Sequence, residues 1–136
     1  MNKQFRPLNF TLQELVHPDI IKALGEQAWE LLDPTALMML QRIRNIFGPT
    51  YVNITPTVKY KDRGLRLPNS KTGATFSMHK YGKAFDCSFA KFSPAIVRQY
   101  ILNNPDDFPG ITAVENVDGW LHFDCRNCDA IKVFNP

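Results

Sequence analysis

Two short motifs, far apart in the sequence, constrain how this chain of 136 residues can fold. Residues 77–86 read Ser-x-His-x-x-Gly-x-Ala-x-Asp, and residues 120–124 read Trp-x-His-x-Asp. His79, Asp86 and His122 would supply three nitrogen and oxygen ligands and leave one position free for water. This is the coordination of a catalytic zinc ion rather than a structural one. A fold that satisfies both motifs must therefore bring these three residues to one point.

The alternation of apolar and polar residues indicates how this convergence can occur. Residues 84–89 alternate as a strand whose apolar side chains face a core and whose Asp86 faces the other side. A second strand, residues 120–124, places Trp120, His122 and Asp124 on the corresponding outer face, which we expect to be open. His79 and Asp86 are an odd number of residues apart, so one straight strand would direct them to opposite faces. A turn at Gly82 removes this conflict, because it lets His79 reach back over the strand.

The rest of the chain predicts a single α+β domain over residues 1–136, since a second domain would lack apolar residues. Residues 56–76 show little periodicity, and a loop of this length is usually functional or disordered, so we expect it to face the substrate. Helix caps and strand-like runs define the other elements. We expect about three helices, at residues 18–25, 34–47 and 94–103, covering a small, mostly antiparallel sheet with strands near 51–55, 84–89, 111–115, 120–124 and 131–134.

Positive charge is concentrated around the first motif. The formal net charge is +3, and lysines and arginines crowd residues 59–83. From the sequence, a solvated basic loop and a surface that attracts a polyanion are both open. Among polyanions, a negatively charged cell wall is favoured over nucleic acid, because neither a recognition-helix pattern nor an RNA-binding aromatic signature accompanies the charge.

Localisation is inferred from apolar runs and cysteines. No apolar run reaches the roughly 20 residues of a membrane span. The N-terminal residues contain no signal-peptide core, so we expect synthesis in the cytoplasm without a signal peptide. Three cysteines fit a reducing compartment better than a disulfide framework. Cys125 and Cys128 form a lone CxxC, which is a redox pair, a local disulfide or, as we favour, two residues packed against the sheet.

Taken together, the two motifs resemble those of the zinc D,D-carboxypeptidase and L,D-endopeptidase family of peptidoglycan peptidases, in particular the small peptidase domains of bacteriophages. The likeness extends over residues 10–126, because residues 9–15, 42–48 and 52–55 also follow the usual order of the family. The paired motifs are specific, whereas either one alone would be weak. The resemblance implies a fold like that of D,D-peptidases and hedgehog domains, with Zn²⁺ bound by His79, Asp86 and His122.

The resemblance also implies a catalytic carboxylate before the last histidine and an arginine before the first. Glu115, at the end of a strand, is preferred over Asp118, which lies in the following turn. Arg66 is the expected arginine, and Arg63 is the alternative or a substrate-binding residue. The carboxylate would exchange protons with the attacking water and the leaving amine, and the arginine would hold an oxyanion or a substrate carboxylate. Met78 departs from the family, where a glutamine is common.

Several neighbouring side chains are candidates for substrate binding. Ser77 is expected to orient the loop, Tyr81 to line the cleft or to be only structural, and Trp120 to pack or form a wall of the site. Asp124 either orients a zinc ligand or is an ordinary surface aspartate. His17 lies outside both motifs, and we expect it to be a packed or surface residue.

The sequence as a whole predicts a zinc metallopeptidase that hydrolyses stem peptides of peptidoglycan. A phage endolysin, or a related lytic factor acting after release or as a virion component, fits this description. The alternative is a non-catalytic, zinc-bearing binding or virion structural component on the same scaffold, because a fold alone does not establish an activity. We expect peptidoglycan peptide as the partner, with no membrane and no nucleic acid; the sequence does not determine the oligomeric state, and a monomer is the default.

Overall fold

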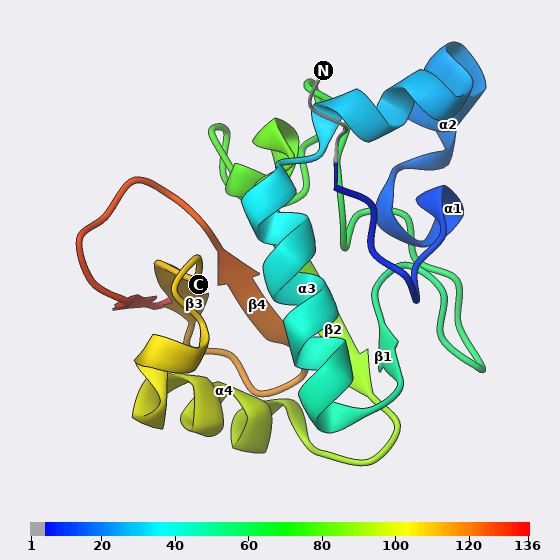
Figure 1. Ribbon diagram of the computed structural model, residues 1–136. Helices are drawn as coiled ribbons and strands as arrows, with labels where there is room; N and C mark the ends of the chain where they lie inside the picture. The colour runs from blue at the N-terminus through cyan, green and yellow to red at the C-terminus, as the bar shows by residue number, and fades with distance from the viewer. Residues whose placement is uncertain (1–4) are drawn as a thin grey trace.

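The computed structural model describes residues 5–136 and has an α+β architecture (Figure 1). Five strands form one sheet in the order β1-β2-β4-β3-β5. The sheet is mixed but mostly antiparallel, because only β3 and β5 pair in parallel. The helices are α1 (Leu12–Leu15), α2 (Pro18–Leu24), α3 (Pro34–Phe47) and α4 (Pro94–Asn103), the 3-10 helices are η1 (Gly25–Leu31), η2 (Met78–Tyr81) and η3 (Pro105–Asp107), and the strands are β1 (Thr50–Tyr51), β2 (Ala84–Phe89), β3 (Ala113–Glu115), β4 (Leu121–Asp124) and β5 (Lys132–Phe134).

The three expected helices are present, and their caps explain where they begin. The Asp33 carboxylate accepts a hydrogen bond from Ala36 N at 3.0 Å where α3 starts. The Ser93 hydroxyl accepts one from Ile96 N at 3.3 Å where α4 starts. A proline follows each cap, at the first helical position. A backbone N–H there has no partner within the helix, so its absence from proline costs no hydrogen bond. α3 lies across one face of the sheet, and α4 packs against β2 and β4 below it (Figure 1).

His17 has a structural position, as expected. It caps α2, and its Nδ1 accepts a hydrogen bond from Asp19 N at 3.0 Å. The side chain is buried and lies outside the group formed by the other two histidines. Within residues 5–136, no helix combines the length and apolarity needed to span a membrane.

The strand expected at residues 51–55 is largely absent. β1 is limited to Thr50 and Tyr51 because Asn53 directs its hydrogen bonds away from the sheet. The Asn53 N–H donates to Glu14 O at 2.9 Å, and Asn53 Oδ1 accepts from Arg63 N at 3.0 Å. The buried Asn53 therefore fastens the beginning of the long loop to the N-terminal helices.

The two motifs meet on β2 and β4 in the register that a shared site requires. Asp86 lies directly opposite His122, and on the core face Phe85 lies opposite Phe123. The outer face was expected to be open, and this is wrong, since Asp86 and His122 are only 7% and 6% exposed. Side chains from outside the two strands cover this face: His79 of η2, Arg66 of the preceding loop and Phe134 of β5.

Gly82 ends η2 and returns the chain into β2. Its φ of +70° is in the left-handed region, and a Cβ atom on it would lie 1.9 Å from the Leu31 carbonyl oxygen. Gly82→Ala is therefore expected to lower the free energy of unfolding by about 2 kcal/mol or more, measured by urea unfolding. Gly119→Ala is the matched control, because its Cβ would meet nothing within 4 Å. Equal midpoints for the two variants would contradict this account of the turn.

Candidate metal centre

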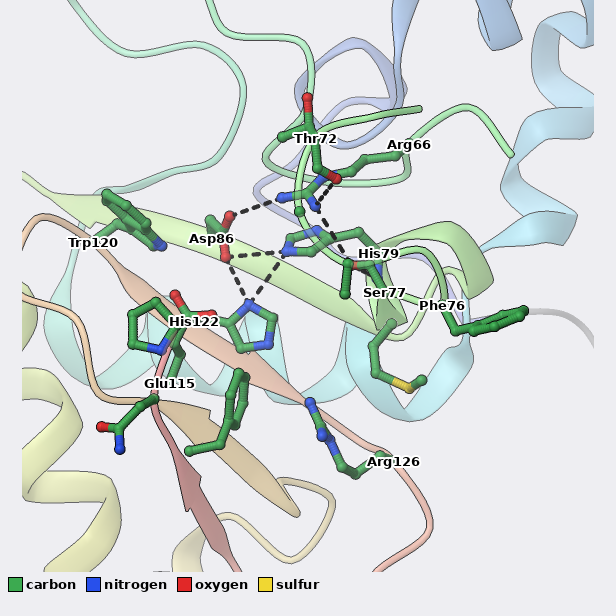
Figure 2. Close-up of a pocket in the computed structure, with 16 residues that line it drawn as sticks. Arg66, Thr72, Phe76, Ser77, His79, Asp86, Glu115, Trp120, His122 and Arg126 are labelled. Carbon is green, nitrogen blue, oxygen red and sulfur yellow. Dashed lines mark hydrogen bonds and ion pairs between the residues drawn. The ribbon is translucent and has the colours of Figure 1, made fainter. Parts of the chain in front are cut away.

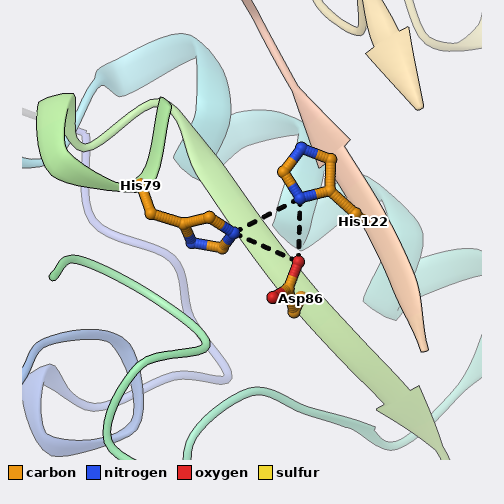
Figure 3. Close-up of side chains that lie close together, drawn as sticks. All are labelled: His79, Asp86 and His122. Carbon is orange, nitrogen blue, oxygen red and sulfur yellow. Dashed lines mark hydrogen bonds and ion pairs between the residues drawn. The ribbon is translucent and has the colours of Figure 1, made fainter. Parts of the chain in front are cut away.

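Three buried side chains direct one donor atom each toward a common point (Figure 3). His79 Nε2 lies 3.2 Å from Asp86 Oδ1 and 3.3 Å from His122 Nδ1. The Asp86 and His122 donor atoms are 2.9 Å apart. A tetrahedral ion with bonds of about 2.0–2.1 Å separates neighbouring ligand atoms by roughly 3.3 Å. The three donors are thus spaced as ligands of one ion, and the group can bind a metal.

The partners of the remaining ring nitrogens determine which nitrogens can bind the metal. His79 Nδ1 lies 2.9 Å from Gly64 O, and because a carbonyl oxygen can only accept, this nitrogen carries the hydrogen. His122 Nε2 lies 2.8 Å from Asp124 Oδ2, which holds a hydrogen there in the same way. His79 Nε2 and His122 Nδ1 are therefore the nitrogens available to an ion. Such outer contacts are typical of histidine ligands in metal sites.

Asp124 is not a surface aspartate; its exposed fraction is 0%. Arg126 holds it from the other side, with Nε 2.8 Å from Asp124 Oδ1 and Nη2 2.6 Å from Oδ2. The Arg126 guanidinium in turn lies over the Phe134 ring, at 4.5 Å from the centroid. Sequence reasoning did not identify Arg126 or Phe134. Arg126 could have been found, because the alternation that places His122 and Asp124 on one face continues to the second residue after Asp124.

Asp124→Asn is expected to weaken zinc binding about 10- to 100-fold, the usual effect of replacing an outer partner of a metal-bound histidine. The amide can still accept a hydrogen bond, but it lacks the charge that orients His122 and binds Arg126. Competition with a chromophoric chelator measures the affinity. Asp129→Asn, at an exposed position in the same C-terminal segment, is the control. An unchanged affinity would show that His122 does not need Asp124.

Arg66 connects the long loop to the metal ligands. Its Nε donates to Asp62 O at 2.7 Å, and its Nη1 donates to Thr72 O at 3.0 Å. Its Nη2 lies 3.5 Å from Asp86 Oδ2, the carboxylate oxygen that does not face the histidines. The Ser77 hydroxyl accepts from His79 N at 3.3 Å where η2 begins. Arg66 therefore orients Asp86, and Ser77 orients His79. Both side chains also lie beside the candidate metal position.

The ligands line a cleft of about 500 Å³ together with Arg66, Ser77, Glu115 and Trp120 (Figure 2). The sheet register explains the position of Glu115. Asp86 pairs with His122, and Val114 of β3 pairs with Phe123 of β4. The residue after Val114 therefore lies level with His122 and on the same face. Asp86, His122 and Glu115 consequently form a row across β2, β4 and β3.

Three other candidates from the sequence lie outside this cleft. The Asp118 side chain is fully exposed, and its Oδ1 is 4.0 Å from Arg98 Nη2. Tyr81 is half-exposed and borders a different hollow, lined mainly by α2 and residues 65–68. Arg63 lies in a space next to the cleft, with its guanidinium 3.8 Å from the centre of the Tyr60 ring.

The contacts within the ligand group stabilise the charged forms of Asp86 and His122. Burial alone would raise the pKa of Asp86, but the charge of His79 and hydrogen bonds from both histidines hold it well below its usual value. Burial alone would lower the pKa of His122, yet hydrogen bonds to Asp124 and Asp86 raise it to about 9. Without a metal, His122 is thus protonated at neutral pH. A divalent cation would take the place of this proton.

The donor set restricts which ions fit. Two imidazoles suit zinc, copper, iron and nickel, whereas magnesium and calcium prefer oxygen ligands. Among residues 5–136, no fourth histidine, cysteine or carboxylate donor joins the group. Three protein ligands with a free position are typical of catalytic zinc, and two histidines with one carboxylate also bind iron(II) in some oxygenases. The residues fit a zinc ion, and direct metal analysis distinguishes it from iron.

The cysteines take no part in this group. Cys87 is completely buried in the core, and burial, with the nearby charge of Asp86, raises the pKa of its thiol. Cys125 packs at the edge of the core, and its Sγ donates to Asp33 Oδ2 at 3.3 Å. Burial and this contact raise the pKa of Cys125 to about 12. Cys125 and Cys128 are both free thiols, so the local disulfide is not formed.

Comparisons with protein-family models, with curated proteins and with solved structures find no match to this chain.

Proposed function

We propose that this protein is a zinc-dependent metallopeptidase that hydrolyses peptide bonds in the stem peptides of peptidoglycan. The observation that carries the proposal is the set of three buried donor atoms, spaced for one ion, in a cleft that also contains Glu115. The resemblance of both motifs to peptidoglycan peptidases supplies the substrate class. On this proposal the fold belongs with the D,D-peptidase and hedgehog domains, and the protein acts on the cell wall as an endolysin or a virion component.

The residues around the cleft have complementary roles in this proposal. A bound zinc ion would supply a water of lowered pKa and a Lewis acid for the scissile carbonyl. Glu115 accepts a proton from the attacking water and returns it to the leaving nitrogen. Arg66 fixes the loop and Asp86, and its permanent charge favours the oxyanion that develops nearby. Trp120 forms part of the cleft wall against which a peptide can pack.

Purified protein incubated with bacterial cell walls is expected to release muropeptides, detected by mass spectrometry. A chelator should stop the release, and added zinc should restore it, because three ligands alone provide no nucleophile. Elemental analysis should find zinc rather than iron, at one ion per chain. Full activity in excess chelator would reject the metal mechanism. Stoichiometric zinc without turnover would favour the non-catalytic binding component.

A further inference from the structure

A second hollow, of about 640 Å³, adjoins the cleft at Asp86. Four residues line both spaces: Arg66, Thr72, Asp86 and Trp120. The rest of its wall comes largely from residues 59–63, and we call this space the basic hollow. Because both spaces include Asp86, a ligand in the basic hollow would be continuous with one bound beside the metal ligands.

The wall of the basic hollow carries positive charges that lack acidic partners. Within residues 5–136, no ion pair joins Lys59, Lys61 or Arg63 to a carboxylate. Four cationic side chains of the wall, Lys59, Lys61, Arg63 and Arg66, face only two carboxylates, Asp62 and Asp86, and Asp86 belongs to the metal group. The hollow therefore has an excess of positive charge that an anionic ligand would neutralise.

The same wall is held in place, unlike an ordinary solvated loop. Ile54 and Lys59 form an antiparallel bridge, and the Tyr60 N–H donates to Asn53 O at 2.6 Å. The buried Asn53 side chain also accepts from Arg63 N, and the Arg63 guanidinium stacks on the Tyr60 ring. The backbone that carries Lys59 and Lys61 and the Arg63 side chain are therefore in place before a ligand arrives, which lowers the conformational entropy lost on binding.

We propose that the basic hollow binds a carboxylate group of the peptide substrate next to the scissile bond. This inference rests on the proposed function, and it adds that the substrate is acidic on the side of the cleft away from Glu115. A nucleic acid is disfavoured because the cleft lining continues with apolar Phe76, Met78 and Phe134, and its further cation, Arg126, is already paired with Asp124. Binding along a phosphate backbone needs a continuing positive track, which this lining does not provide.

Binding, rather than turnover, tests the basic hollow. Zinc-loaded Glu115→Gln protein is titrated calorimetrically with a soluble disaccharide-tetrapeptide bearing free carboxylates, and with the same muropeptide after its carboxylates are converted to amides. The free form is expected to bind about tenfold more tightly, as two or three exposed charge contacts would give. Lys59→Glu with Lys61→Glu should remove this preference. Lys22→Glu with Lys91→Glu, the same charge change at exposed positions that do not line the hollow, should retain it.

The possible results separate this inference from the proposed function. Equal binding of the two muropeptides, or an unchanged preference in the Lys59/Lys61 variant, overturns the carboxylate site even if the parent protein digests cell walls. A charge preference that depends on Lys59 and Lys61 supports the site even if no peptide is ever hydrolysed. Binding of a single-stranded 20-nucleotide DNA that needs these lysines, without muropeptide binding, overturns it in favour of nucleic acid.

Discussion

Asp86→Asn is expected to abolish both zinc retention and muropeptide release while the chain still folds. Asp86 Oδ1 lies 3.2 Å from His79 Nε2 and 2.9 Å from His122 Nδ1. Of the three ligands, Asp86 is the anionic one. An amide has nearly the same volume but neither the charge nor the affinity of a carboxylate for a divalent cation. Zinc content after dialysis, measured by elemental mass spectrometry, and release of muropeptides report the two losses.

The asparagine variant is more informative than alanine. Removing the whole side chain would leave Arg66, 7% exposed, beside an empty space. Both variants remove the charge that pairs with Arg66, but asparagine keeps an oxygen that can accept a hydrogen bond and leaves no cavity. Alanine loses the whole partner of a buried group, at a cost of about 3–5 kcal/mol, and can eliminate activity by unfolding the protein. Asp106→Asn, at an exposed position on η3, is the matched control and should retain zinc and activity. One equivalent of zinc in dialysed Asp86→Asn protein would contradict the proposed ligand set.

The helices and the main strand could be predicted because their signals are local. A capping side chain, a following proline and apolar residues at helical spacing fixed the beginning of α3 and α4 within the sequence itself. β2 was recognised at its correct bounds from alternation alone. The convergence of His79, Asp86 and His122 was predictable for a similar reason, since strand parity and one glycine restrict the possible arrangements.

The remaining features depend on contacts between distant segments. β1 is shorter than its β-branched sequence predicted, because Asn53 binds the Glu14 and Arg63 backbone instead of a neighbouring strand. The covering of the outer face depends on side chains from η2, the long loop and β5, which no local pattern places there. The sequence also left Asp118 open as the alternative base, and only the tertiary structure shows it pointing to solvent and pairing with Arg98.

The two histidines are oriented by different means, which gives the site unequal sensitivity to mutation. A backbone carbonyl, that of Gly64, orients His79, and a Cβ on Gly64 would lie 2.0 Å from Leu15 O. His122 is instead oriented by a side chain, Asp124, that depends on Arg126. Single substitutions can therefore alter the His122 side without disturbing the backbone, whereas changes on the His79 side require the chain to move.

Glu115→Gln is expected to lower the turnover number about 10²- to 10⁴-fold, the usual contribution of a general base, without loss of zinc. Glu115 is level with His122 in the sheet and lines the cleft, but it is not one of the three donors, so its charge is not needed to hold the ion. The glutamine keeps the shape of the side chain and removes its ability to accept a proton. Asp118→Asn should retain full turnover, because that carboxylate faces solvent. Rates on one defined muropeptide, with zinc content measured in parallel, separate the two residues, and the opposite pattern would transfer the role of base to Asp118.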